Sequence, residues 1–334
     1  MMRFVAWAAL VFLLLATAVG SLAIGNQTDS PLTVLAALFT PESVDPATAT
    51  IIRDMRVPRV MLGIIVGAAL GAAGAGYQGL FRNPLADPFI IGASSGASLG
   101  ITVAVLAGWQ LTALGLGPIS LAGMAGALLT VWLVYAIASV AGEVPMLSLL
   151  LAGIAVSSFL GAVVAIMMLL HDEHLITIFS SILGTLSGDW NRVTVGGGII
   201  IPGLLVLWSM SRPLDVLGFG DDAAQSLGLS LTRVRIALVV TASVITAAAV
   251  AAAGVIGFVG LIAPHVARMF VGPRHHGVVP ASCLVGAILL LISDDLARTV
   301  FAPTEIPVSL VSALLGGPFF LYLLKSRSTR WGTN

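Results

Sequence analysis

Charged residues are scarce in this sequence. Lysine, arginine, aspartate and glutamate make up 9% of 334 residues, whereas hydrophobic residues make up 58% and the mean hydropathy is +1.08. A water-soluble domain carries roughly a quarter charged residues, so this chain has too few polar side chains to build a surface facing water. The scarcity excludes a soluble globular protein and predicts a chain embedded in lipid.

The sequence contains one cysteine and carries no net charge. The single cysteine, Cys283, excludes an internal disulfide and a metal cluster built from several cysteines. The 15 basic residues balance 15 acidic ones, so the net charge is zero. A neutral chain has no general attraction for nucleic acid, and we expect no nucleic-acid partner.

The sequence also lacks the phosphate-binding loop of ATP-hydrolysing proteins. A phosphate-binding loop ends in Gly-Lys-Ser/Thr, but the only lysine, Lys325, follows Leu324. We therefore expect no catalytic residue, no metal and no cofactor in this chain. Ion-coupled carriers usually hold carboxylates deep in the membrane, whereas Asp294, Asp295 and Glu305 lie at the ends of predicted helices. An ion-coupled secondary transporter is disfavoured but stays an alternative.

Apolar runs near the ~20 residues needed to cross a bilayer recur along the chain. They predict a single all-α transmembrane domain over residues 1–334 with about ten helices, at 4–24, 58–80, 89–107, 117–140, 145–170, 193–210, 231–252, 254–272, 278–293 and 306–324. Only Gly254 and its small neighbours separate the seventh run from the eighth. The first run is longer than the ~7–15 residues of a signal-peptide core, which favours a retained helix over a cleaved signal.

The distribution of basic residues predicts the orientation. With the N-terminus in the cytoplasm, ten of the 15 basic residues fall inside, which supports cytoplasmic N- and C-termini. The inner ten are Arg3, Arg82, Arg212, Arg233, Arg235, Arg268, Arg274, Lys325, Arg327 and Arg330. The outer five are Arg53, Arg56, Arg59, Arg192 and Arg298.

Small residues recur at every fourth position of the second run, at Gly63, Gly67 and Gly71. This spacing places them on one stripe and predicts close packing of helices. A weak similarity between residues 63–88 and 246–268 indicates an inverted internal repeat, an arrangement common in transporters.

Five blocks of residues, in a fixed order from about residue 53 to 325, carry a family resemblance. They are Arg56-Val57-Pro58-Arg59, the run from Arg82 to Pro88, the run from Gly220 to Gly228, the run from Gly254 to His265, and Glu305-Ile306-Pro307 with Gly316-Gly317-Pro318. With this order and spacing the chain resembles the permease subunits of type II ATP-binding-cassette importers for iron-siderophores, haem and cobalamin. The resemblance implies ten helices per subunit in a bacterial cytoplasmic (inner) membrane. It also implies a homodimer with the path at its interface, two cytoplasmic subunits that bind ATP and magnesium, and a periplasmic or lipid-anchored substrate-binding protein.

The polar segment at about residues 213–230 is predicted to form a short cytoplasmic helix. Asp221 and Asp222 suit the first turn of a helix, and Gly228 suits its C-terminal cap. In the family that this chain resembles, the segment is the coupling helix that docks into the ATPase; an ordered loop without docking is the alternative. The predicted coupling residues are Gly220, Asp221, Asp222, Ala223, Ala224, Gln225, Ser226, Leu227 and Gly228. The turn from Arg82 to Pro88 is interpreted as structural, with Asn83 or Asp87 as a cap.

Three outer arginines, Arg56, Arg59 and Arg298, run against the preference of basic residues for the cytoplasm. The resemblance places them where arginines receive acidic residues of the binding protein, and the forked guanidinium group suits such pairing. The alternatives are local pairing with Asp54, Asp294 or Asp295, or contact with lipid headgroups, because exposed charges alone are weak evidence.

The resemblance places the cytoplasmic gate at the turn into the fifth helix, which here contains Met146 and Leu147. The family's cobalamin permease has a pair of small hydroxyl residues there, so this departure disfavours cobalamin. We predict a ferric siderophore or related iron chelate as cargo, with haem or cobalamin as alternatives. The outer run from His171 to His174 could hold a metal on paper, but a solvated loop is the preferred interpretation.

Overall fold

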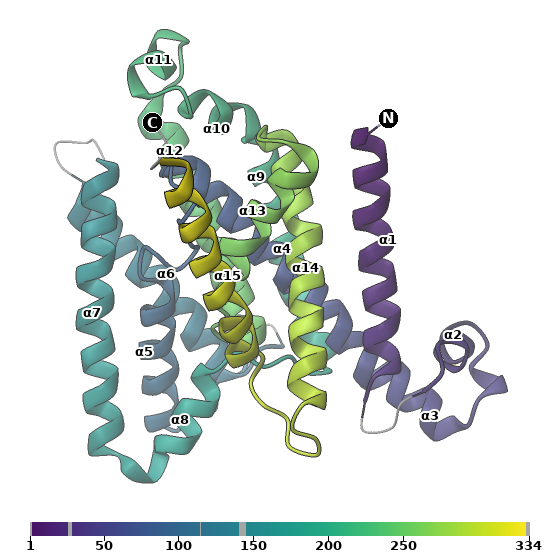
Figure 1. Ribbon diagram of the computed structural model, residues 1–334. Helices are drawn as coiled ribbons and strands as arrows, with labels where there is room; N and C mark the ends of the chain where they lie inside the picture. Colours follow the sequence, from purple (N-terminus) through teal and green to yellow (C-terminus); the bar gives the residue numbers. More distant parts are fainter. Residues whose placement is uncertain (1, 26–28, 114, 140–144, 332–334) are drawn as a thin grey trace.

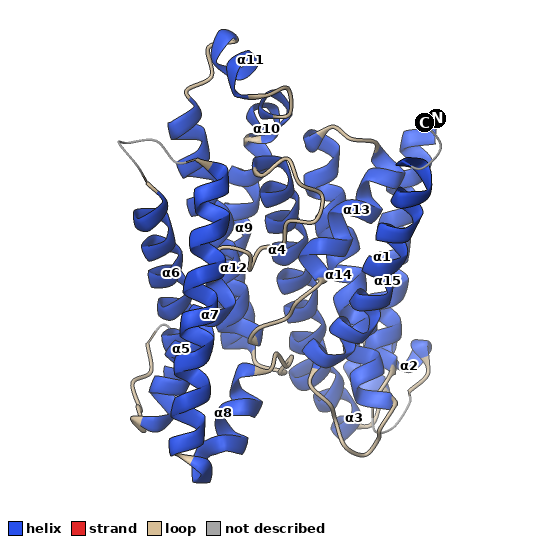
Figure 2. Ribbon diagram, turned by 60° about the vertical axis from the view of Figure 1, so that its left-hand side comes forward, coloured by secondary structure: helices blue, strands red, loops and turns tan. Residues whose placement is uncertain are grey.

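The computed structural model describes residues 2–25, 29–113, 115–139 and 145–331. Within these ranges the chain is helical and contains no β-strand, with only two isolated bridges, Ala113 to Leu116 and Leu183 to Val255. The long helices run roughly side by side along one direction (Figures 1 and 2). Three of the basic side chains used to predict orientation, those of Arg3, Arg327 and Arg330, lie outside the described part.

The helices follow the predicted apolar runs and add short helices between them. The α-helices are α1 (Met2–Ala23), α2 (Pro31–Phe39), α3 (Pro46–Thr50), α4 (Val57–Leu80), α5 (Ala93–Leu106), α6 (Pro118–Ala138), α7 (Met146–Leu170), α8 (Leu175–Ile182), α9 (Trp190–Ser209), α10 (Ser211–Leu217), α11 (Asp221–Ser226), α12 (Leu231–Ala253), α13 (Val259–Val271), α14 (His275–Thr299) and α15 (Val308–Trp331). Three further short turns are η1 (Pro41–Ser43), the π-helical η2 (Ile51–Arg56) and η3 (Asp172–His174).

Each of the ten predicted runs contains an apolar helix. In the described part of the chain, 7 helices are long and apolar enough to cross a membrane. The other three, Ala93–Leu106, Val259–Val271 and Val308–Leu321, are apolar but only 10–17 residues long. The all-helical membrane architecture is therefore confirmed, and the count of ten crossings stays a prediction.

The uncertain break between the seventh and eighth runs is a true chain reversal. Gly254 ends α12 with φ +77°, and Phe258 precedes α13 with φ +68°. Backbone bonds from Gly184 to Val255 O (3.2 Å) and from Thr185 to Ala253 O (2.8 Å) satisfy the polar groups that this break leaves unpaired.

Helix α4 lies at the centre of the bundle and contacts α9, α12, α13 and α14. A Cβ atom on Gly71 would overlap the carbonyl oxygen of Ser282, and one on Gly74 would overlap that of Gly260. The small-residue stripe thus lets the backbones of α13 and α14 lie directly against α4, as the packing interpretation predicted.

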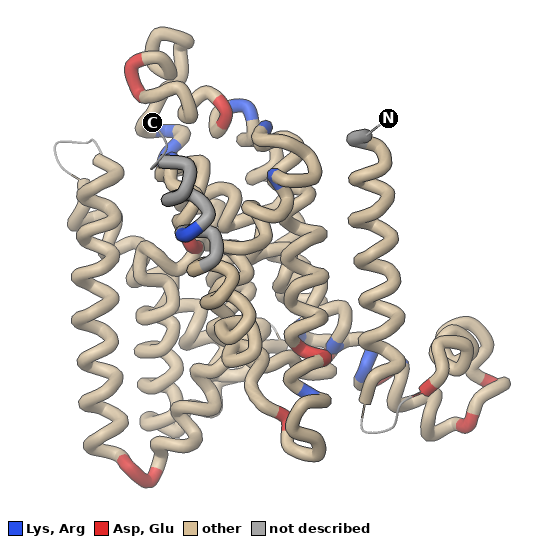
Figure 3. Tube along the Cα trace, viewed as in Figure 1, with Lys and Arg blue, Asp and Glu red and all other residues tan. Residues whose placement is uncertain are grey.

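The two ends of the bundle carry different elements (Figures 1 and 2). The start of α1, the end of α15, α10 and α11 lie at one end, which we call the coupling end. The other end, where α2, α3 and α8 lie, is called the arginine end because it holds Arg56, Arg59 and Arg298. Charged residues gather toward these two ends (Figure 3).

Candidate functional site

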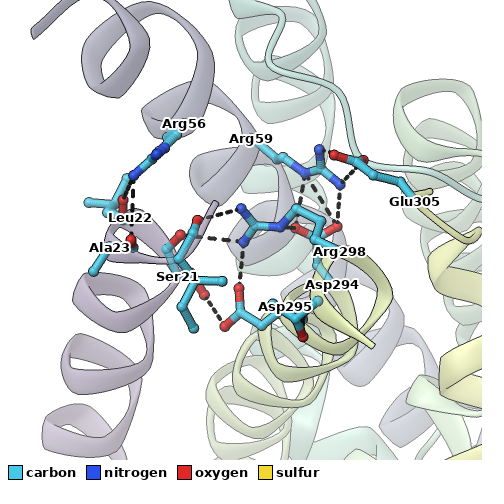
Figure 4. A network of polar contacts seen from close by, with 11 residues as sticks. Ser21, Leu22, Ala23, Arg56, Arg59, Asp294, Asp295, Arg298 and Glu305 are labelled. Atoms are coloured by element: carbon cyan, nitrogen blue, oxygen red, sulfur yellow. Dashed lines mark hydrogen bonds and ion pairs between the residues drawn. The ribbon is translucent and has the colours of Figure 1, made fainter. Parts of the chain in front are cut away.

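At the arginine end, Arg59 near the start of α4 joins two carboxylates from other parts of the chain. Its guanidinium pairs with Asp294 of α14 at 3.0 Å and with Glu305 of the loop before α15 at 3.0 Å (Figure 4). The Asp294 side chain is buried, whereas that of Glu305 is half-exposed. Arg59 therefore has one partner inside the protein and one on its surface.

Arg298 is the most buried of the three arginines. It pairs with Asp294 at 3.2 Å and with Asp295, and it donates to the carbonyl oxygens of Ile24 (2.9 Å) and Ser21 (3.3 Å). Those carbonyls belong to the C-terminal end of α1, where a helix leaves acceptors unpaired and favours positive charge. Arg298 thus caps α1 and fixes it to α14.

Arg56 makes a second contact with the same end of α1. It donates to the Leu22 carbonyl oxygen at 2.8 Å (Figure 4). It also pairs with Asp29 at 2.8 Å. Together, the Arg56 and Arg298 side chains connect the end of α1 with η2 and α14. Sequence reasoning missed Asp29, because a partner 27 residues away in the chain leaves no local signal.

The three arginines were predicted to dock a binding protein. The structure brings all three to one cavity of about 470 Å³, which Glu305 and Asp29 also line. Local pairing with Asp294 and Asp295 is present, whereas Asp54 forms no ion pair with a described residue. The docking role itself stays a prediction, and it now requires Arg59 to exchange or share partners.

At the coupling end, α10 and α11 extend beyond the ends of the long helices (Figure 2). Gly220 (φ +105°) and Gly228 (φ +81°) flank α11 in backbone conformations that favour glycine, and Asp221 and Asp222 form its first turn as predicted. Phe219 and Leu227 are exposed beside it. Ala224 is buried, whereas Asp222, Gln225 and Ser226 of the same helix are exposed, so one face of α11 and its flanking residues form the surface available to a partner.

The Arg82–Pro88 turn contacts this segment. Asn83 and Asp87 accept hydrogen bonds from the backbone amides of Leu85 (3.0 Å) and Phe89 (2.9 Å), so both stabilise the turn, but neither caps a helix, because the N-cap of α5 is Gly92. Arg82 pairs with Asp221 at 3.2 Å. This contact could not be predicted from neighbouring residues, because its two partners lie 139 positions apart.

The predicted gate residues begin α7 at the coupling end (Figure 1). Leu147 is exposed and Met146 packs against the main hydrophobic core. Residues 140–144 of the preceding turn lie outside the described residues. The gate role stays a prediction.

Histidines form no metal centre within the described ranges. No group of three or more His, Cys, Asp or Glu side chains there is placed to hold a metal ion. The His171 ring contacts the Met167 carbonyl oxygen at 3.0 Å, and the His275 ring contacts Asp215 at 2.7 Å. These two side chains hold neighbouring chain segments together.

Three kinds of comparison with known proteins give matches over most of the chain. The FecCD transport family profile matches residues 13–326. The cobalamin import system permease protein BtuC of Halobacterium salinarum is 41% identical over 287 residues, covering 85% of this chain and 76% of the relative. The hemin transport system permease protein HmuU of Yersinia pestis is 37% identical over 315 residues, covering 93% and 94%. A solved structure of a metal-chelate type ABC transporter in an inward-facing conformation matches with a TM-score of 0.82 at 30% identity, covering 97% and 99%.

Proposed function

Because the chain belongs to the FecCD transport family, we propose that it carries a ferric siderophore or related iron chelate across the cytoplasmic membrane. It is a membrane-spanning permease subunit of an ATP-binding-cassette importer, as its relatives are. The observation that carries the cargo proposal is the full-length match to a metal-chelate type transporter. We propose that the chain works as a homodimer with two ATP-binding subunits and a substrate-binding protein, and that the coupling end faces the cytoplasm.

Cobalamin is the second candidate cargo. The 41% identity to a cobalamin permease favours it, whereas the bulky pair Met146 and Leu147 at the predicted gate disfavours it. Haem is supported at 37% identity over almost the whole chain. Binding of the cognate substrate-binding protein to ferric siderophores, haem and cobalamin, measured side by side, discriminates these cargoes. Tight binding of cobalamin alone would overturn the iron-chelate proposal.

An ion-coupled carrier is the alternative of another class. Asp294 is buried, but it lies near the end of α14 and is paired with two arginines, so it is not an unpaired carboxylate at mid-membrane. The placement of this carboxylate supports the importer proposal.

The test is uptake by vesicles that contain the purified chain and its ATPase partner. We expect uptake only with ATP and with binding protein, and expect it to stop when the catalytic glutamate of the ATPase is replaced. Uptake that persists on an ion gradient without ATP would contradict the importer assignment.

A further inference from the structure

One carboxylate at the coupling end joins three helices. Asp221, the first residue of α11, accepts from Arg82 on one oxygen at 3.2 Å and from Arg235 on the other at 2.6 Å. Arg82 follows the end of α4, and Arg235 lies in the first turns of α12. A forked carboxylate that receives two guanidinium groups fixes both the position and the direction of the helix that carries it.

The backbone on both sides of this contact is held in uncommon conformations. Arg82 has φ +50°, a region that a non-glycine residue rarely adopts, and Gly220 has φ +105°. A Cβ atom on Gly220 would lie 3.7 Å from Nη1 of Arg82, so the two turns lie against each other. Such backbone conformations persist where surrounding contacts hold them, and the pair with Asp221 is one such contact.

From Arg82 the contacts continue into the membrane domain. One turn earlier on α4, the buried Gln78 donates to the Leu261 carbonyl oxygen (3.2 Å) and accepts from Arg268 (2.5 Å), both on α13. The end of α4 is therefore tied to α11 on one side and to α13 on the other. Helix α4 then runs through the bundle centre toward Arg59 at the arginine end.

We propose that Asp221 is a positioning residue that makes α11 move as one body with α4 and α12 when the ATPase changes shape. This inference rests on the proposed function and deepens it. Asp221, Arg82 and Arg235 need not contact the ATPase; they determine whether its motion reaches the helices. Because Asp221 and Arg82 are partly exposed, their pair contributes little to stability. Asp221→Asn also keeps a side-chain oxygen that can accept from the more buried Arg235, so we expect its effect to fall on coupling rather than on folding.

The chain supplies a matched control. Asp222 is the next residue of the same helical turn, carries the same charge, is exposed, and forms no ion pair with a described residue. Asp221→Asn removes the charge that holds Arg82 and Arg235 while keeping the side-chain shape, and Asp222→Asn removes an equal charge without that contact. Asp221→Glu keeps the carboxylate and serves as the conservative variant.

The experiment measures ATP hydrolysed per substrate imported by the complete complex in vesicles. We expect this ratio to rise roughly fivefold or more in Asp221→Asn, the lower limit of a typical coupling free energy between sites. Asp222→Asn should raise the ratio less than Asp221→Asn does, because the Asp222 side chain holds neither arginine, and Asp221→Glu should recover most of the coupling. ATPase association should be unchanged in Asp221→Asn and Asp221→Glu. Equal ratios for Asp221→Asn and Asp222→Asn, or lost ATPase association in Asp221→Asn alone, would overturn the proposal.

A second measurement does not depend on the proposed function. Hydrogen exchange of the purified chain without partners should be faster in α11 for Asp221→Asn than for Asp222→Asn, because the helix has lost its attachment. Equal exchange would show that Asp221 does not hold α11. Absence of ATP-driven uptake by the wild type would instead contradict the importer assignment. The exchange measurement would still test whether Asp221 holds α11, because it uses the chain without partners.

Discussion

The arginine end and the coupling end both join helices through arginine–carboxylate pairs, but the pairs differ in burial. At the arginine end the exposed fraction of the side chain is 3% for Asp294 and 7% for Arg298. At the coupling end it is 39% for Asp221 and 41% for Arg82. Breaking a buried pair is costly because the remaining charge is left without a partner and without solvation by water. An exposed charge is solvated by water when it loses its partner, so breaking an exposed pair costs little. The comparison indicates a buried anchor at one end and a partly exposed connection at the other.

The largest expected effect compares the two ends directly. Arg298→Ala should lower the free energy of unfolding by about 3–5 kcal/mol, because it leaves buried carboxylates and the α1 carbonyls without their donor. Arg82→Ala should lower it by only about 0–1 kcal/mol. Denaturant unfolding of the purified chain in detergent measures both. If both variants lost the same free energy of unfolding, the distinction between the buried anchor and the partly exposed connection would be wrong.

The second prediction concerns α4, which passes between the two ends. Gly74→Ala should cost about 1–3 kcal/mol, because its Cβ atom would overlap the backbone of α13 and force the helices apart. Gly161→Ala on α7 is the matched control, since nothing lies within 4 Å of the added atom. The same unfolding measurement applies. A neutral Gly74→Ala would show that α4 does not pack rigidly enough to connect the ends.

The third prediction tests the turn beside the coupling end by pH. Burial raises the pKa of Asp87, which lies in the α4–α5 turn outside the spans, from 3.8 to about 6. The folded state therefore holds this proton more tightly than the unfolded state, and stability should fall as pH rises from about 4 to about 6. Asp87→Asn keeps an acceptor for the Phe89 amide and should remove this loss. Melting temperatures at pH 5 and pH 7.5 should then differ less in the variant; an identical pH profile would contradict the shift.

The smallest expected effect concerns partner exchange at the arginine end. If Arg59 docks an acidic residue of the binding protein, Glu305→Gln should free its guanidinium and tighten the complex by about two- to fivefold, the range of an exposed ion pair. Asp294 still holds Arg59, so stability should be unchanged. Affinity at low salt provides the readout, because salt screens such pairs. Weaker binding would show that Glu305, rather than Arg59, faces the partner.

The sequence predicted most of the fold because lipid dictates long apolar helices, and the apolar runs mark α1, α4, α7 and α14 directly. The acidic first turn of α11 was also readable, since it depends on neighbouring residues. The partners of Arg298, Arg82 and Gln78 were harder to predict. Each depends on helices far apart in sequence that meet only after the bundle packs, so residue type alone could not distinguish an exposed docking arginine from a buried cap.

The most direct test of the account is hydrogen exchange of the chain in detergent with and without its ATPase subunits. We predict that the ATPase slows exchange in α11 and in the residues on both sides of it, and leaves the end of α1 and residues 294–298 unchanged. This result would show that the ATPase contacts the coupling end and not the arginine end. Slower exchange at the arginine end with no change in α11 would contradict the account.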